Sequence, residues 1–220
     1  MARIVITGAN RGIGFEFAKQ LKAQGNDVTA VCRKHSAQLD ALGVTVHDGV
    51  DLSDSNSLIE LAKKFPAQSI DILINNAGVL IGDRYGAVDV SNIERQIQVN
   101  AIGPFVLTQA LDAALAEGGK VVMITSRMGS MGDNTSGGQY GYRMSKAAMN
   151  ASAVSLSHDL RDRGIAVGVL HPGYVATEMV GGRGDISPED AAARLIQRIE
   201  ELNLDLSGEF LHASGDFLPW

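Results

Sequence analysis

The sequence predicts an α/β protein built on one doubly wound, mainly parallel sheet of seven strands with helices on both faces. Short apolar, β-branched runs alternate with longer helical patterns along the chain, which is typical of a parallel sheet. One run, from Ile70 to Ile74, is almost entirely apolar, as expected for a strand buried on both faces. Glycine-rich loops follow several predicted strands, so we expect ligands to bind at the carboxyl ends of the strands.

Four strands and one helix are predicted in the N-terminal part of the chain. The first strand runs from Arg3 to Thr7 and leads directly into a helix from Gly12 to Ala23. Further runs rich in apolar and β-branched residues predict strands from Asp27 to Cys32, from Val44 to His47 and from Ile70 to Ile74. A strand followed by a helix and another strand is the repeating unit of a parallel sheet.

The middle of the chain contains two long helical patterns. The first runs from Ser91 to Glu117 and includes Pro104, where we expect a kink or break because proline cannot donate the helical hydrogen bond. Lys120 to Thr125 is the predicted fifth strand. The second helix runs from about Tyr140 to Arg163 and is followed by Gly164, a residue type that commonly ends helices.

The C-terminal part completes the sheet. Ile165 to Leu170 and Glu209 to His212 are the predicted sixth and seventh strands. Between them a helix begins at Ser187-Pro188, with serine as the N-cap and proline at the first helical position. No repeat, low-complexity tract or linker interrupts this order, so we interpret residues 1–220 as a single domain.

The composition suits a soluble globular protein. Apolar residues make up 45% of the chain, yet no apolar run approaches the roughly 18 residues needed to span a membrane. The chain leads from Met1 into the first strand without the pattern of a secretory signal. Cys32 is the only cysteine, so no internal disulfide can form. We therefore expect a cytoplasmic protein without a membrane partner.

The charge distribution bears on possible partners. The formal net charge is −6 at pH 7, and acidic and basic residues are interspersed along the chain. No basic block or stripe is present of the kind that binds nucleic acid phosphates. We therefore expect no nucleic acid partner, and no residues are assigned to a metal ion.

A glycine-rich turn, Thr7-Gly8-Ala9-Asn10-Arg11-Gly12-Ile13-Gly14, ends the first predicted strand. Glycines let the backbone turn tightly and approach a pyrophosphate, whose charge is favoured at a helix N-terminus. The spacing Gly-x3-Gly-x-Gly differs from the common Gly-x-Gly-x-x-Gly fingerprint. Its position between a strand and a helix nevertheless predicts a Rossmann-type dinucleotide site, formed by Gly8, Asn10, Arg11, Gly12, Ile13 and Gly14.

Two further motifs carry candidate chemistry. Tyr142 and Lys146 are four residues apart in a predicted helix and therefore lie on one face. A free tyrosine titrates near pH 10, and a neighbouring ammonium group lowers that pKa toward a range useful for proton transfer. Asn75-Asn76-Ala77-Gly78 closes the fourth strand. Its small residues allow a ligand to lie against the backbone, while its amides can fix that ligand or satisfy the loop backbone.

Taken together, these motifs resemble the short-chain dehydrogenase/reductase family, and the segment from Gly137 to Lys146 resembles its C-factor-like and carbonyl-reductase-like branch. The resemblance extends from Thr7 to Trp220. The matching motifs occur in the family's order: Thr7-Gly8, Gly12-Ile13-Gly14, Asn75-Asn76-Ala77-Gly78, Asn100, Ser126, Tyr142, Lys146 and Pro172-Gly173. The resemblance implies an NAD(P)-dependent oxidoreductase that transfers a hydride between the nicotinamide and a carbonyl or alcohol substrate. It also implies a homodimer or homotetramer.

The resemblance assigns four catalytic residues. Tyr142 would give a proton to a carbonyl oxygen or remove one from an alcohol, while Lys146 would lower the tyrosine pKa and bind the nicotinamide ribose. Ser126 would hydrogen-bond the substrate oxygen, and Asn100 would hold a water that links Lys146 to solvent. Ser126 lies sixteen positions before Tyr142, a few more than is usual, and Ser130 lies twelve before it. We favour Ser126 because the end of a strand is rigid, and Ser130 is the alternative.

The cofactor is expected to be NADP(H), with NAD(H) possible. The second strand ends in Val31-Cys32-Arg33-Lys34, without the acid that binds the ribose hydroxyl in NAD enzymes. Arg11 and Arg33 could instead clamp a 2′-phosphate with bidentate hydrogen bonds. The resemblance adds further cofactor contacts at Asp51, Leu52, Asn76, Ala77, Gly78, Tyr142, Lys146, Pro172, Gly173, Val175 and Thr177.

The segment after Thr177 is short, because only residues 178–186 separate it from the next helix. We therefore hypothesise an open pocket for diverse aldehydes or ketones, lined by the adaptable side chains of Met128, Met131, Tyr174 and Met179. The C-factor resemblance supplies an alternative, an NADP-binding sensor or signalling protein with little turnover. A third interpretation is an isomerase or dehydratase on the same scaffold. The complete set of proton-transfer residues favours an oxidoreductase.

Overall fold

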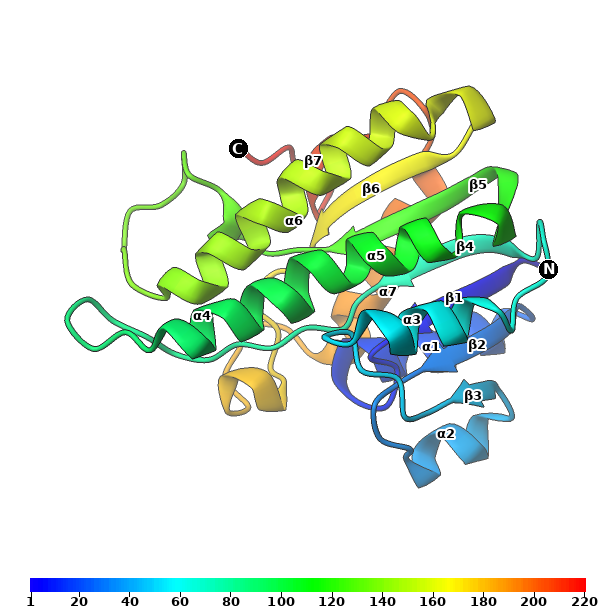
Figure 1. Ribbon diagram of the computed structural model, residues 1–220, viewed down its shortest axis with the longest axis horizontal. Helices are drawn as coiled ribbons and strands as arrows, with labels where there is room; N and C mark the ends of the chain where they lie inside the picture. The colour runs from blue at the N-terminus through cyan, green and yellow to red at the C-terminus, as the bar shows by residue number, and fades with distance from the viewer.

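The computed structural model describes residues 1–220, which form one seven-stranded sheet with the order β3-β2-β1-β4-β5-β6-β7. All neighbouring strands run parallel (Figure 1). The strands are β1 (Arg3–Thr7), β2 (Asp27–Val31), β3 (Thr45–His47), β4 (Ile70–Asn75), β5 (Leu115–Ile124), β6 (Ala166–His171) and β7 (Phe210–His212). The order reverses between β1 and β4, so the loops after these strands diverge and leave a crevice. The predicted doubly wound fold is confirmed.

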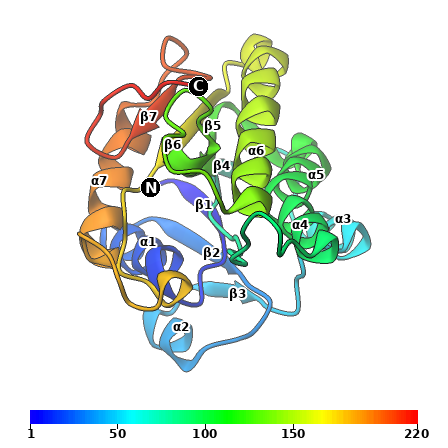
Figure 2. The same cartoon turned by 90° about the vertical axis from the view of Figure 1, so that its left-hand side faces the viewer.

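Helices lie on both sides of the sheet (Figure 2). On one side are α1 (Gly12–Ala23), α2 (Ala37–Leu42) and α7 (Pro188–Glu201). On the other side are α3 (Ser55–Ala62), α4 (Val90–Ile97), α5 (Gly103–Ala110) and α6 (Tyr140–Asp159). None of these helices combines the length and the apolar character that crossing a membrane would require.

A separate hydrophobic core fills each space between the sheet and its helices. Along β1, Val5 packs into the core beneath α3, α5 and α6, whereas Ile4 and Ile6 pack into the core beneath α1 and α7. This alternation buries both faces of the strand, which explains the continuous apolar runs in the sequence. Phe17 of α1 and Met149 of α6 have no exposed surface. Both helices are therefore fixed firmly against the sheet.

The expected break in the helical pattern from Ser91 to Glu117 is confirmed, but the C-terminal bound of the pattern is wrong. The chain forms α4, one turn of π-helix (Gln98–Ile102) and then α5, and β5 already begins at Leu115. Pro104 accounts for the interruption, because it has no N–H to donate to the carbonyl of Asn100 four residues earlier. The irregular turn therefore falls at Asn100, one turn before the proline.

Other boundaries differ by less. The periodicity of the sequence does not predict the short helices α2 and α3, which connect the edge strands of the sheet. The helix α6 ends at Asp159, and Arg161–Arg163 forms a single 3₁₀ turn before Gly164, which has a φ of +71°. The cap at Ser187 is confirmed, because its side chain accepts a hydrogen bond from the backbone N–H of Asp190.

Candidate active site

A cleft of about 420 Å³ opens at the carboxyl ends of the central strands. Most of the predicted cofactor residues line it, namely Gly8, Asn10, Arg11, Gly12, Ile13, Gly14, Arg33, Asp51, Leu52, Asn76, Ala77, Gly78, Tyr142, Lys146, Pro172 and Thr177. Gly173 and Val175 do not line the cleft. Val175 is buried and forms a backbone bridge with Ile186, and Gly173 packs against Ile186 and His212. Their backbone instead shapes the loop that carries Pro172 and Thr177.

The glycine turn after β1 is shaped by close backbone contacts. Gly8 has a φ of +67°, and a Cβ atom on Gly14 would lie 2.2 Å from the carbonyl oxygen of Gly8. Larger residues at either position would therefore force the turn apart. The N-terminus of α1, which follows, has no capping side chain and no acidic residue in its first turn. Its positive end is uncompensated and suits a pyrophosphate.

Thr7 and Asn76 join this turn to the end of β4. The Thr7 hydroxyl accepts hydrogen bonds from the backbone N–H groups of Asn76 and Ala77, at 3.0 and 3.1 Å. In return, the Asn76 side-chain amide donates to the carbonyl oxygens of Thr7 and Gly8, at 3.0 and 3.4 Å. Asn76 therefore satisfies loop backbone, which was one of the two roles expected from its motif.

Tyr142 and Lys146 lie buried side by side on α6, with the Lys146 Nζ 5.9 Å from the centre of the Tyr142 ring. Burial raises the pKa of Tyr142 to about 12, and the Ser126 hydroxyl acts in the opposite direction. Burial also lowers the pKa of Lys146 to about 8. In this structure burial therefore outweighs the expected effect of the ammonium group on the tyrosine, and Ser126 is the neighbour that lowers its pKa.

Lys146 is held in place by the strand beside it. Its Nζ donates a hydrogen bond of 2.9 Å to the carbonyl oxygen of Ile124 and lies 3.9 Å from the sulfur of Met149. A Cβ atom on Gly78 would lie 3.7 Å from this Nζ and 3.2 Å from the Oδ1 of Asn100. Gly78, Asn100 and Lys146 therefore meet at the floor of the cleft.

The Asn100 side chain makes three hydrogen bonds to protein groups. Its Oδ1 accepts from the backbone N–H of Val79 at 2.8 Å, and its Nδ2 donates to the Val79 carbonyl and to Ser145 Oγ. Asn100 has no exposed surface. The side chain therefore fixes the loop after β4.

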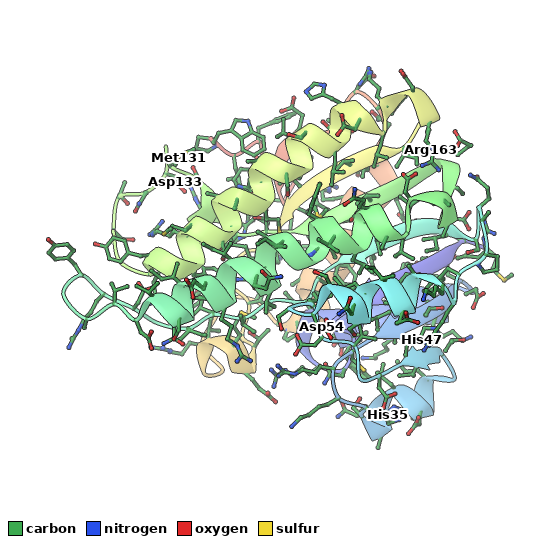
Figure 3. The ribbon with its side chains drawn as sticks, viewed as in Figure 1. His35, His47, Asp54, Met131, Asp133 and Arg163 are labelled. Atoms are coloured by element: carbon green, nitrogen blue, oxygen red, sulfur yellow. The ribbon has the colours of Figure 1, made fainter.

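The two serine candidates have different surroundings. Ser126 stands next to the Tyr142 phenol and also accepts a hydrogen bond of 3.2 Å from the backbone N–H of Met128. Ser130 instead donates to the carbonyl oxygen of Trp220 and accepts from the backbone N–H of Asp133. The geometry favours Ser126 as the partner of Tyr142, whereas Ser130 organises the loop in which Figure 3 labels Met131 and Asp133.

Both arginines expected to bind a 2′-phosphate, Arg11 and Arg33, line the cleft, and so does an acid that the sequence analysis did not single out, Glu178. Arg11 forms an ion pair of 2.7 Å with Glu178, which also lines the cleft. Asp51 is hydrogen-bonded by Ser53, which lowers its pKa, and the charge of Arg33 acts in the same direction. The glycine turn, the free end of α1 and the two arginines fit NADP(H).

His171 is not among the residues assigned to catalysis. Burial lowers its pKa to about 3, and the charges of His212 and Arg127 act in the same direction. Its ring lies 5.2 Å from that of His212, centroid to centroid. His171 is therefore neutral at physiological pH and packs between the ends of β6 and β7.

The family model described as short chain dehydrogenase matches residues 2–187. The 1-hydroxy-2-glutathionyl-2-methyl-3-butene dehydrogenase of Rhodococcus sp. (strain AD45) is 42% identical over 226 residues, covering 100% of both chains. The C-signal protein of Myxococcus xanthus is 42% identical over 154 residues, covering 69% of this chain and 93% of that protein.

Solved structures are similar over the whole chain. The carbonyl reductase Sniffer of D. melanogaster superposes with a TM-score of 0.94 at 29% identity, covering 100% of both chains. The NADPH-bound carbonyl reductase from chicken fatty liver superposes with a TM-score of 0.90 at 27% identity, covering 100% of this chain and 99% of the other.

The buried ammonium group of Lys146 predicts a stability effect. A pKa of about 8 against an ordinary 10.5 corresponds to roughly 3 kcal/mol. We therefore expect Lys146→Met to raise the free energy of unfolding at pH 7 by up to about 3 kcal/mol, measured by urea denaturation. Between pH 8 and 10.5 the unfolded wild-type chain binds more protons than the folded one, so wild-type stability rises and the advantage of the variant shrinks.

Lys63→Met is the matched control, because Lys63 is exposed and pairs only with Glu60 one helical turn away. Its effect should stay within about 0.5 kcal/mol at every pH. An advantage of Lys146→Met that did not change between pH 7 and pH 10 would contradict the assigned pKa of Lys146.

Proposed function

The chain belongs to the short-chain dehydrogenase family, and we propose that it is an NADPH-dependent oxidoreductase that interconverts a carbonyl compound and an alcohol, with Tyr142 as the general acid and base. The observation that carries this proposal is the buried Tyr142 and Lys146 pair, which lies in the wall of a cleft that also contains the glycine turn. A site that only bound nucleotide would have no need of this proton-transfer pair.

Tyr142, Ser126 and Lys146 have separate roles in the proposed reaction. The bound nicotinamide supplies or accepts the hydride. Tyr142 donates its phenol proton to the carbonyl oxygen during reduction, and Ser126 beside it hydrogen-bonds the same oxygen and helps to stabilise the developing negative charge. The positive charge of Lys146 stabilises the phenolate that remains. Because both groups are excluded from water, these interactions are stronger than they would be at the surface.

The preference for NADPH rests on charge. Arg11, after β1, and Arg33, after β2, both line the cleft, and no acid directly follows β2 to bind the ribose hydroxyls. The similar carbonyl reductase from chicken fatty liver carries NADPH, which supports the same cofactor here. A 2′-phosphate would accept bidentate hydrogen bonds from one or both guanidinium groups.

The substrate is proposed to be an aldehyde, a ketone or the corresponding alcohol. Of the four expected lining side chains, Met179 lines the cleft and is 43% exposed, whereas Met128, Met131 and Tyr174 do not line it. The flexible side chain of Met179 supports a pocket that accepts different shapes. The name of the Rhodococcus relative describes a dehydrogenase of a hydroxy compound that carries a glutathionyl group. Alcohols with a bulky thioether substituent therefore belong among the candidate substrates.

A nucleotide-binding signalling protein is the second candidate, favoured by the similarity to the C-signal protein of Myxococcus xanthus. That similarity covers 69% of the chain, whereas the dehydrogenase of Rhodococcus matches along the full length of both proteins. The full-length match and the buried proton-transfer pair support turnover as the principal function.

The first test is turnover with NADPH and a panel of aldehydes, ketones and diketones, together with NADP and thioether alcohols in the reverse direction. Tyr142→Phe keeps the ring but loses the proton, and should reduce turnover by at least about a hundredfold. Tyr140→Phe is the matched control, because Tyr140 lies in the same helical turn but is 37% exposed. Tight NADPH binding without turnover of any substrate would favour the signalling alternative.

The proposed role of Arg11 and Arg33 is tested by comparing the binding of NADPH and NADH. Arg11→Ala and Arg33→Ala should each weaken NADPH binding by about tenfold or more, since a hydrogen bond to a charged group contributes roughly 1.5–3 kcal/mol. NADH lacks the 2′-phosphate, so its dissociation constant should change little, as measured by fluorescence titration. Equal affinity of the wild-type protein for NADPH and NADH would refute this assignment.

Removing the charge of Glu178 should strengthen NADPH binding, whereas removing either arginine should weaken it. Its carboxylate holds Arg11 and must release it before Arg11 can bind a phosphate. Glu178→Gln should therefore tighten NADPH binding by up to about fivefold, the range expected for an exposed ion pair. The gain should disappear in the Arg11→Ala background. A gain that persisted without Arg11 would mean that Glu178 repels the cofactor directly.

A further inference from the structure

The helix that carries Tyr142 begins without a cap of its own. The helices α3, α4 and α7 are capped by Asp54, Asp89 and Ser187, whose side chains accept hydrogen bonds from first-turn backbone N–H groups. The equivalent position of α6 is Gln139, which has a φ of +53° and makes no side-chain cap. The first-turn N–H groups of α6 therefore need an acceptor from elsewhere in the chain.

Asp83, in the loop between β4 and α4, supplies that acceptor. Its Oδ1 accepts a hydrogen bond from the backbone N–H of Tyr140, and its Oδ2 accepts from the N–H of Gly141 at 2.8 Å. The Asp83 carbonyl oxygen also accepts from the N–H of Gln139 at 3.2 Å. One residue of a distant loop thus satisfies three consecutive N–H groups immediately before Tyr142.

The segment that carries Asp83 is itself fixed by two buried amides, and we call residues 79–83 the strap. The Asn100 side chain binds both the N–H and the carbonyl of Val79. One helical turn earlier, the Gln96 side chain accepts from the N–H of Ile81 at 2.9 Å and donates to its carbonyl at 3.2 Å. Gln96 has no exposed surface. Alternate residues of the strap are therefore bound as they would be by a neighbouring β-strand.

The strap, α4 and α6 meet at Gly141. A Cβ atom on Gly141 would lie 2.4 Å from the Nε2 of Gln96 and 3.2 Å from the Oδ2 of Asp83. No side chain fits there, so the close approach depends on glycine. Figure 1 shows the loop after β4 beside the start of α6, on the left of the molecule.

We propose that Asp83 is a positioning residue for Tyr142, which it holds in place by capping the first turn of α6 from the strap. The inference rests on the proposed role of Tyr142. Asn100 binds one end of the strap, at Val79, and Asp83 forms the other end. The strap therefore connects the floor of the cleft to the start of the helix that carries Tyr142. A displacement of about 1 Å in a reacting group can cost a hundredfold in rate, so a loosened first turn reduces the chemical step more than cofactor binding.

The test compares Asp83→Ala, Asp83→Asn and Asp89→Ala. At saturating NADPH, Asp83→Ala should lower kcat by about tenfold to a hundredfold. The dissociation constant of NADPH should change less than twofold. Asp83→Asn should recover most of kcat, because asparagine caps helices about as well as aspartate. Asp89→Ala removes a comparable cap from the first turn of α4, at the opposite end of that helix from Gln96, and should leave kcat unchanged.

Gly141→Ala distinguishes positioning from simple helix stability. Alanine is about 1 kcal/mol more favourable than glycine within a helix, so a purely local effect would leave activity unchanged or improve stability. The added methyl group instead pushes Gln96 and Asp83 away, and the variant should lose kcat as Asp83→Ala does. Retention of the full kcat in Gly141→Ala would argue against the proposal.

Amide hydrogen exchange separates failure of this inference from failure of the proposed function. Asp83→Ala should accelerate exchange in residues 79–83 and 140–146 together, whereas Asp89→Ala should accelerate only the start of α4. If the wild-type protein turns over no substrate, the proposed function fails while exchange still tests the strap. Unchanged exchange in residues 140–146, or equal losses of kcat in Asp83→Ala and Asp89→Ala, would overturn the inference.

Discussion

The junction between β1 and β4 is the constraint on which the rest of the cleft depends. At this point the strand order reverses, so the two loops diverge and open the crevice. The Thr7 hydroxyl and the Asn76 amide close the junction with hydrogen bonds in both directions. Thr7 is buried, and Asn76 is half-buried at the wall of the cleft, so these bonds hold the two strand ends together next to the open space. The glycine turn can therefore leave its N–H groups for a ligand without losing its own shape.

The shape of the cleft also depends on polar groups that are buried along α4, the π-turn and α6. Gln96, Asn100, Ser145 and Lys146 all have less than a tenth of their surface exposed, and each has a hydrogen-bond partner. A buried polar group without a partner would cost several kcal/mol, so each of these contacts specifies one arrangement of the loop and the helices. The same burial sets the pKa values of Tyr142 and Lys146, which links the packing of the site to its chemistry.

Charged groups in the outer part of the cleft are exposed to solvent, unlike the buried groups of its interior. Arg11 and Glu178 are more than two thirds exposed, so their attraction is weakened by solvent and easily exchanged for a phosphate. The inner, buried groups are fixed before any ligand arrives, whereas the outer charges can rearrange. The cleft thus combines a rigid interior around Tyr142 and Lys146 with an adaptable, charged entrance.

The sequence alone determined the parallel sheet, the glycine turn at the start of α1 and the shared face of Tyr142 and Lys146. These features depend on local spacing, because strand and helix periodicities are set by neighbouring residues. From Ser91 to Glu117 the sequence predicted the break at Pro104, whose missing N–H interrupts the helix, but it did not show that β5 already begins at Leu115.

Only the tertiary structure decided the contacts between distant residues. Asp83 and Tyr140 are separated by 57 positions, and Arg11 and Glu178 by 167, so no local pattern could have paired them. The sequence already favoured Ser126 over Ser130, but only the folded loop shows the Ser126 hydroxyl hydrogen-bonded to the Tyr142 phenol. The pKa of Tyr142 was likewise set by burial rather than by its spacing from Lys146, because desolvation depends on everything packed around the phenol.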